Sequence, residues 1–152
     1  MQEQKKVGII GAGPSGLLAA KYALQNGFFP VVFEKGGDIG GVWSHEDGAV
    51  WQDMTTNLSK YNCKFSDFEW PEGTPIFPPS AMMTSYIEDY ATKFDLRKYI
   101  KFNCEVVLLA KNSSSYKIKY KNGDETVEED FKFVIVASGI FVNPNIPNIK
   151  GI

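Results

Sequence analysis

The sequence has few residues of the kinds that build metal sites or disulfide frameworks, with two cysteines and one histidine in 152 residues. Cys63 and Cys104 are far apart and form no C-x-x-C pair, so we expect reduced thiols that pack as small apolar side chains. His45 has no neighbouring ligands, and we expect it to be a loop residue. The composition therefore predicts a cytoplasmic protein with no metal site and no redox-active cysteine pair.

An excess of basic charge and a long hydrophobic run are also missing. Sixteen Lys and Arg stand against eighteen Asp and Glu, which gives a net charge of −2. This balance argues against a surface for nucleic acid or for an anionic membrane, either of which needs clustered basic residues. Lys5 and Lys6 precede the uncharged residues 7–20, as in a signal peptide, but glycines and a proline interrupt that stretch and it is too short to span a bilayer.

The first part of the chain reads as a βαβ unit. Residues 7–10 are a short apolar run stopped by glycine, as expected of a buried parallel strand. Residues 16–26 have helical periodicity, and Gly27 supplies a stop. Residues 31–34 read as a second strand, which completes a strand, glycine turn, helix and strand within about thirty residues.

The next part combines a long loop region with a second helix. Residues 36–80 are irregular and rich in glycine, proline and aromatic residues, which is uncommon unless the region is functional. In the helix that follows, Ser85 and Glu88 match an S-x-x-E capping box.

The last part reads as strands. Residues 105–110 read as a strand, 116–120 alternate between apolar and polar, and 125–128 return after Asn122-Gly123 as a hairpin turn. Residues 133–137 are a continuous apolar run typical of a central parallel strand buried on both faces. We therefore predict a three-layer, Rossmann-like α/β domain with 7–10, 31–34 and 133–137 in one parallel sheet. An antiparallel meander over 105–128 stands against one side of it.

The motif Gly11-Ala12-Gly13-Pro14-Ser15-Gly16 is G-x-G-x-x-G between the first strand and the helix. Gly11 permits the tight turn, Gly13 lets a pyrophosphate approach the backbone, and Gly16 allows close helix packing. Pro14 suits the first helical turn, and Ser15 lies in the same turn. The N–H groups and the positive end of the helix then face the phosphates, so the motif predicts a dinucleotide site.

Glu34 completes this fingerprint. It ends the second predicted strand, where a carboxylate can accept hydrogen bonds from both ribose hydroxyls and would repel a 2′-phosphate. The bound adenosine is therefore that of FAD or NAD rather than NADP, and we place the adjoining Lys35 in the same site.

A second glycine cluster over 36–41 favours FAD, because it implies another close approach of backbone to ligand. We assign Gly41, Val42 and Trp43 to the cofactor site. Trp43 is either a neighbour of the flavin ring or an aromatic anchor for the loop.

Several segments in order resemble the flavin-containing monooxygenases. They are GAGPSG at 11–16, GGVW at 40–43, TNLSK at 56–60, FSDFEWPE at 65–72, EDYATKFDLRKYIKFN at 88–103 and VIVASGIFVNPNIP at 134–147. The resemblance implies FAD and NADPH as cofactors, and dioxygen and a small nucleophile as substrates. NADPH reduces FAD, and a flavin C4a-hydroperoxide then passes one oxygen to nitrogen or sulfur. It also implies that Asn57 of the TNLSK segment is the catalytic residue, beside the flavin and the nicotinamide; a turn-forming amide is the plainer alternative.

The resemblance also implies that the chain is incomplete. Family members continue into an F-x-G-x-x-x-H-S motif and a second G-x-G-x-x-G for NADPH, and neither is present. We expect residues 1–152 to be the amino-terminal part of an FAD-binding domain, with the NADPH domain and a returning segment in the remainder of the parent polypeptide. The alternatives are a Baeyer–Villiger monooxygenase, disfavoured by Ser44-His45-Glu46-Asp47 after the GGVW loop, and a non-enzymatic, free-standing FAD- or NAD-binding module. The missing cysteine pair disfavours a disulfide reductase.

Overall fold

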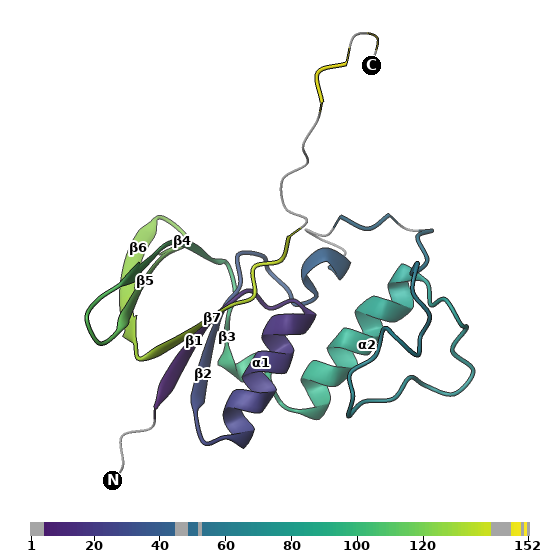
Figure 1. Ribbon diagram of the computed structural model, residues 1–152, viewed down its shortest axis with the longest axis horizontal. Helices are drawn as coiled ribbons and strands as arrows, with labels where there is room; N and C mark the ends of the chain where they lie inside the picture. Colours follow the sequence, from purple (N-terminus) through teal and green to yellow (C-terminus); the bar gives the residue numbers. More distant parts are fainter. Residues whose placement is uncertain (1–4, 45–48, 52, 141–146, 150, 152) are drawn as a thin grey trace.

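The computed structural model describes residues 5–44, 49–51, 53–140, 147–149 and 151. They form three layers: a parallel sheet in the middle, two helices against one face and an antiparallel sheet against the other (Figure 1). This arrangement confirms the fold class that the sequence predicts.

The central sheet has four parallel strands in the order β3-β2-β1-β7. Their bounds are Lys6–Ile10 for β1, Phe29–Phe33 for β2, Ile100–Lys101 for β3 and Phe133–Val136 for β7. The helix α1 (Pro14–Gln25) connects β1 to β2, so the predicted βαβ unit is confirmed.

The helices cover the face of the sheet that presents Val7, Ile9 and Val32. Beside α1 lies α2 (Ser80–Lys93), and the two 3-10 turns η1 (Gly41–Trp43) and η2 (Arg97–Tyr99) lie before and after α2 in the chain. Among the described residues, no helix is long and apolar enough to cross a membrane.

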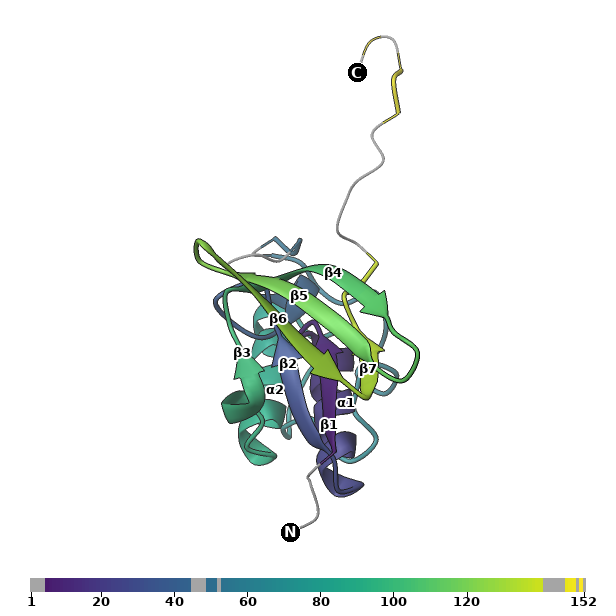
Figure 2. The same cartoon turned by 90° about the vertical axis from the view of Figure 1, so that its left-hand side faces the viewer.

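The opposite face carries the predicted meander, with β4 (Cys104–Lys111), β5 (Tyr116–Asn122) and β6 (Glu125–Phe131) in sequential order. Its inner side chains pack on Val31 and Phe33 of β2. Lys101 of β3 pairs with Glu129 and donates to the Tyr120 hydroxyl at 3.1 Å, which holds the meander over the sheet. The first strand of the meander, β4, crosses the end of the sheet where β1 and β2 finish (Figure 2).

The predicted capping box at Ser85 is wrong. The helix begins five residues earlier, at Ser80, and the Ser85 hydroxyl instead donates to the Ala81 carbonyl inside the helix at 3.1 Å. The Ser80 N–H donates to the Met54 carbonyl at 2.7 Å. A distant loop therefore satisfies one amide of the first turn, which has no side-chain cap.

The strand predicted over 133–137 exists and pairs parallel with β1, but it is not central. Among the described residues no strand pairs with the other edge of β7, and Val136 is 62% exposed, with Phe133 and Ile135 also exposed. A continuous apolar run is typical of a strand that is buried on both faces. The described part of the chain does not bury β7 in this way.

The boundaries of two elements also differ slightly from those that the sequence predicts. Asn122 pairs with Glu125, so the loop of the β5–β6 hairpin consists of Gly123 and Asp124, with Gly123 at φ +60°. The β2 strand ends at Phe33, which places Glu34 just beyond it at the carboxyl end of the sheet.

Candidate dinucleotide-binding site

An open cleft of about 1060 Å³ lies at the carboxyl ends of the parallel strands. This volume suits a large ligand better than a small metabolite, and this end of an open parallel sheet is where such folds bind ligands. Its lining comes from the turn after β1, the segment after β2, η1, β4 and the end of β7. The predicted site residues among the lining are Gly11, Gly13, Pro14, Ser15, Glu34, Lys35, Gly41 and Val42.

Two glycines of the first turn are required by the chain itself. Gly11 has φ +102°, and a Cβ there would lie 2.5 Å from the Ala137 carbonyl oxygen. A Cβ on Gly16 would overlap the Gly11 carbonyl oxygen. Gly16 does not line the cleft; it lets α1 pack tightly against the turn, as the motif predicts.

Gly13 is different, because no contact among the described residues demands a glycine there. Its backbone has φ −72° and ψ −178°, which any residue adopts, and an added Cβ would meet the Gly41 Cα at an ordinary 3.5 Å. Gly13 nevertheless lines the cleft and precedes α1, whose first turn has no side-chain cap. The missing side chain and the positive helix end fit a phosphate group brought close to the backbone.

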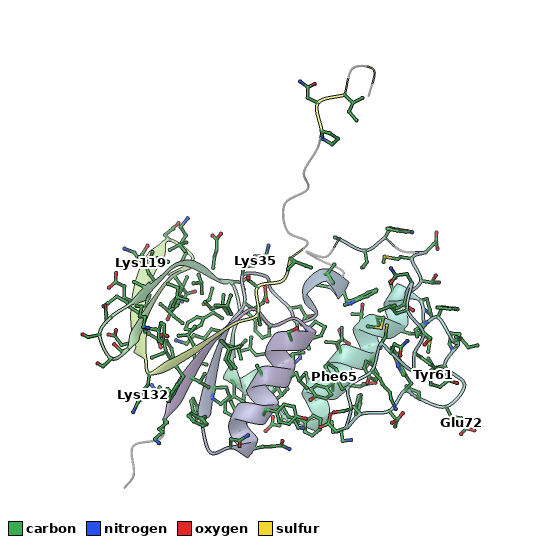
Figure 3. All side chains as sticks on the ribbon, viewed as in Figure 1. Lys35, Tyr61, Phe65, Glu72, Lys119 and Lys132 are labelled. Carbon is green, nitrogen blue, oxygen red and sulfur yellow. The ribbon has the colours of Figure 1, made fainter. Side chains whose placement is uncertain are left out.

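The Glu34 carboxylate connects the two glycine-rich segments. It is 8% exposed and accepts hydrogen bonds from the N–H groups of Ala12 at 2.7 Å and Gly36 at 2.9 Å. Each carboxylate oxygen has a second lone pair, so these bonds leave room for ribose hydroxyls. Lys35 next to it is exposed and lies at the same end of the molecule (Figure 3).

The second glycine cluster packs backbone to backbone against the first. The Gly40 N–H donates to the Ala12 carbonyl at 3.1 Å. Gly41 has φ +58°, and a Cβ on it would lie 3.0 Å from the Gly13 Cα. Trp43 packs against the core under α1 and α2 and is not among the described lining residues, which favours the anchoring role over contact with a flavin ring.

Asn57 is exposed and is not among the described residues that line the cleft. It lies in a ribbon in which residues 55–60 run beside 76–79, joined by bonds from the Thr56 N–H to the Pro78 carbonyl and from the Lys60 N–H to the Ile76 carbonyl. Its catalytic role therefore stays a prediction.

The lining also includes residues that the sequence analysis did not assign to the site, among them Cys104, Glu105 and Val106 of β4. A break in the strand register follows Val106, and such bulges re-aim side chains. Burial raises the pKa of the Cys104 thiol, so it is a neutral packing group. The register break is seen only in the structure, so no sequence pattern points to these residues.

No group of three or more metal-ligating side chains gathers in the part of the chain that the structure describes. His45, and most of the segment from 141 to 147 that resembles the family, lie outside the described residues.

The comparisons with known proteins agree with this geometry. The pattern of the family described as "Flavin-binding monooxygenase-like" matches residues 4–151. Human flavin-containing monooxygenase 2 is 38% identical over 94% of this chain, and the thiol-specific monooxygenase of Saccharomyces cerevisiae is 38% identical over all of it. The chain spans 29% and 38% of the lengths of these two relatives.

Solved structures give the same result. S-allyl-L-cysteine S-oxygenase from Allium sativum has a TM-score of 0.88 at 25% identity, covering 97% of this chain and 39% of that protein. The OTEMO complex with FAD and NADP has a TM-score of 0.76 at 25% identity, covering 100% and 29%. The structures are consistent with the sequence match across nearly the whole chain, and the chain belongs to the flavin-binding monooxygenase-like family.

Proposed function

We propose that this chain is the FAD-binding portion of an NADPH-dependent flavin monooxygenase that oxygenates nitrogen or sulfur nucleophiles. The observation that carries the proposal is Gly13, a glycine that the contacts of the described residues do not require. It lines the same cleft as the Glu34 carboxylate. The names of the relatives support the reaction class, since one is specific for thiols and another is an S-oxygenase. When bound, FAD supplies the redox and oxygen chemistry, and dioxygen is the second substrate.

The residues of this chain hold and orient the cofactor. The turn from Gly11 to Ser15 and the start of α1 bind the pyrophosphate, and Glu34 accepts from the adenosine ribose. Gly41 and Val42 form the facing wall, and Lys35 at the rim adds a positive charge near the phosphates.

We also propose that further polypeptide completes the protein. The chain spans about a third of the length of its curated relatives. The apolar strand β7 has an exposed outer edge, which fits another parallel strand. In this proposal residues 1–152 are the first part of the FAD-binding domain, and NADPH binds mainly to residues outside it. The free cysteines Cys63 and Cys104 fit a cytoplasmic protein.

The test is product analysis with the full polypeptide, FAD, NADPH and dioxygen. A tertiary amine and a thioether should give the N-oxide and the S-oxide, with NADPH consumed. A cyclic ketone converted to its lactone in preference to both would favour the Baeyer–Villiger alternative. Saturable nucleotide binding without NADPH oxidation would favour a non-enzymatic module.

Replacing Glu34 with alanine should weaken FAD binding by about 1–3 kcal/mol, the scale of a charge-assisted hydrogen bond. Calorimetric titration of the ligand-free protein measures this change. Glu125→Ala, which removes an exposed carboxylate on β6 that is not among the described lining residues, is the control and should bind FAD as the parent does. Equal affinities of the Glu34 variant and the parent would remove Glu34 from the site.

With Asn57 replaced by leucine, the full-length enzyme should still bind FAD and still oxidise NADPH. Product formed per NADPH should fall about tenfold, because one amide that both donates and accepts is lost. The lost product should appear as hydrogen peroxide, which a peroxide assay measures beside the product. Asn62→Leu, the same change at an exposed asparagine of the same loop region, should stay coupled. An Asn57 variant as well coupled as the parent would make Asn57 a turn residue only.

A further inference from the structure

One turn of α2 carries two buried polar side chains that the reaction does not use. Ser80 is 1% exposed and Thr84 is 7% exposed, and they lie four residues apart on the same side of the helix. Buried hydroxyls in a helix need partners, and those of these two residues include loop carbonyls outside the helix.

Thr84 contacts the end of the second glycine-rich segment. Its hydroxyl donates to the Trp43 carbonyl at 2.7 Å and lies 3.1 Å from the Ser80 carbonyl. The Ser80 carbonyl is also the regular helical acceptor for the N–H of residue 84, so the shorter contact to Trp43 is the one that uses the hydroxyl proton.

Ser80 contacts the same loop further along the chain. Its N–H donates to the Met54 carbonyl at 2.7 Å, and its hydroxyl lies 3.3 Å from the Trp51 carbonyl. A single helical turn therefore binds the loop at Trp43 and again at Trp51 and Met54.

The loop held at these points forms a wall of the cofactor cleft. Gly41, Val42, Ser44 and Ala49 are among its lining residues. Within η1, the bonds from the Trp43 N–H to the Gly40 carbonyl and from the Ser44 N–H to the Gly41 carbonyl are local to one turn. The bond from the Gly40 N–H to the Ala12 carbonyl holds the start of this turn against the Gly13 turn, and the bond from Thr84 to the Trp43 carbonyl holds its other end against α2.

We propose that Thr84 is a positioning residue for the cofactor site. By holding the Trp43 carbonyl, it fixes the far end of the Gly41–Ser44 wall, whose near end is held to the Gly13 turn by the Gly40–Ala12 bond, before any cofactor binds. This inference rests on the proposed function, since the wall matters only if the cleft binds a dinucleotide.

The test compares Thr84→Val, which keeps the shape and removes the donor, with Thr84→Ser, which keeps the donor. Thr92→Val makes the same change at an exposed position near the end of α2 and is the control. Amide hydrogen exchange in the ligand-free protein is measured first, and the affinity for FAD second.

In Thr84→Val, the amides of Trp43 and Ser44 should exchange about tenfold faster while those of β1 and α1 keep the parent's rates, and FAD affinity should fall about tenfold. Thr84→Ser should keep the parent's exchange rates and FAD affinity, and Thr92→Val should change neither. Faster exchange across the whole protein would mean a merely structural role, and unchanged exchange at Trp43 and Ser44 would equally overturn the inference. If the parent binds no FAD, the proposed function fails, and the exchange rates still decide whether Thr84 holds the loop.

Discussion

Gly13→Ala should leave the ligand-free protein as stable as the parent and should weaken its binding of FAD about 10- to 100-fold. The backbone at Gly13 suits alanine, and the new methyl group would meet the Gly41 Cα at 3.5 Å, an ordinary contact. The same methyl group would occupy the place where the pyrophosphate reaches the backbone, so its effect falls on the ligand alone.

Two measurements check this expectation, thermal unfolding of the ligand-free variant and its titration with FAD. A variant that melts well below the parent would show that the fold needs glycine at this position. A variant that binds FAD as tightly as the parent would show that the cofactor does not approach Gly13.

Gly16→Ala should have the opposite pattern and should unfold the protein at a much lower temperature. The added Cβ would overlap the Gly11 carbonyl oxygen, which is backbone and cannot rotate away as a side chain can. We expect a loss of about 3 kcal/mol or more, or a melting temperature lower by about 6–12 °C, even though alanine favours a helix.

Gly13→Ala is the matched control for this change, because it adds the same methyl group three residues earlier in the same turn. Differential scanning calorimetry of the two ligand-free variants gives the comparison. A Gly16 variant as stable as the Gly13 variant would contradict the close packing of α1 on the turn.

The features that the sequence predicts well are those set by neighbouring residues. The order of strand, glycine turn and helix around Gly11 follows from backbone sterics and from the position of Pro14, and the meander follows from its alternating side chains. Glu34 is placed by the length of the βαβ unit, so its position at the carboxyl end of β2 is predictable even though the strand boundary shifts by two residues at its start.

The features that the sequence does not predict depend on distant partners. The Ser80 N–H at the start of α2 donates to the Met54 carbonyl, a partner that the local sequence does not reveal. Val106 reaches the cleft because β4 crosses the end of the sheet. The apolar run of β7 indicates burial on both faces, and the described residues do not supply it. The case for Asn57 came from a family resemblance rather than from a physical requirement at that position.

Calorimetric titration of ligand-free residues 1–152, without the rest of the parent polypeptide, with FAD and separately with NADP tests the assignment of the cleft most directly. We predict saturable binding of one FAD per chain, weakened in Gly13→Ala, and no binding of NADP in the same concentration range, because the Glu34 carboxylate repels a ribose 2′-phosphate. Absence of FAD binding in the parent, or NADP binding as tight as that of FAD, would contradict the assignment of this cleft to FAD.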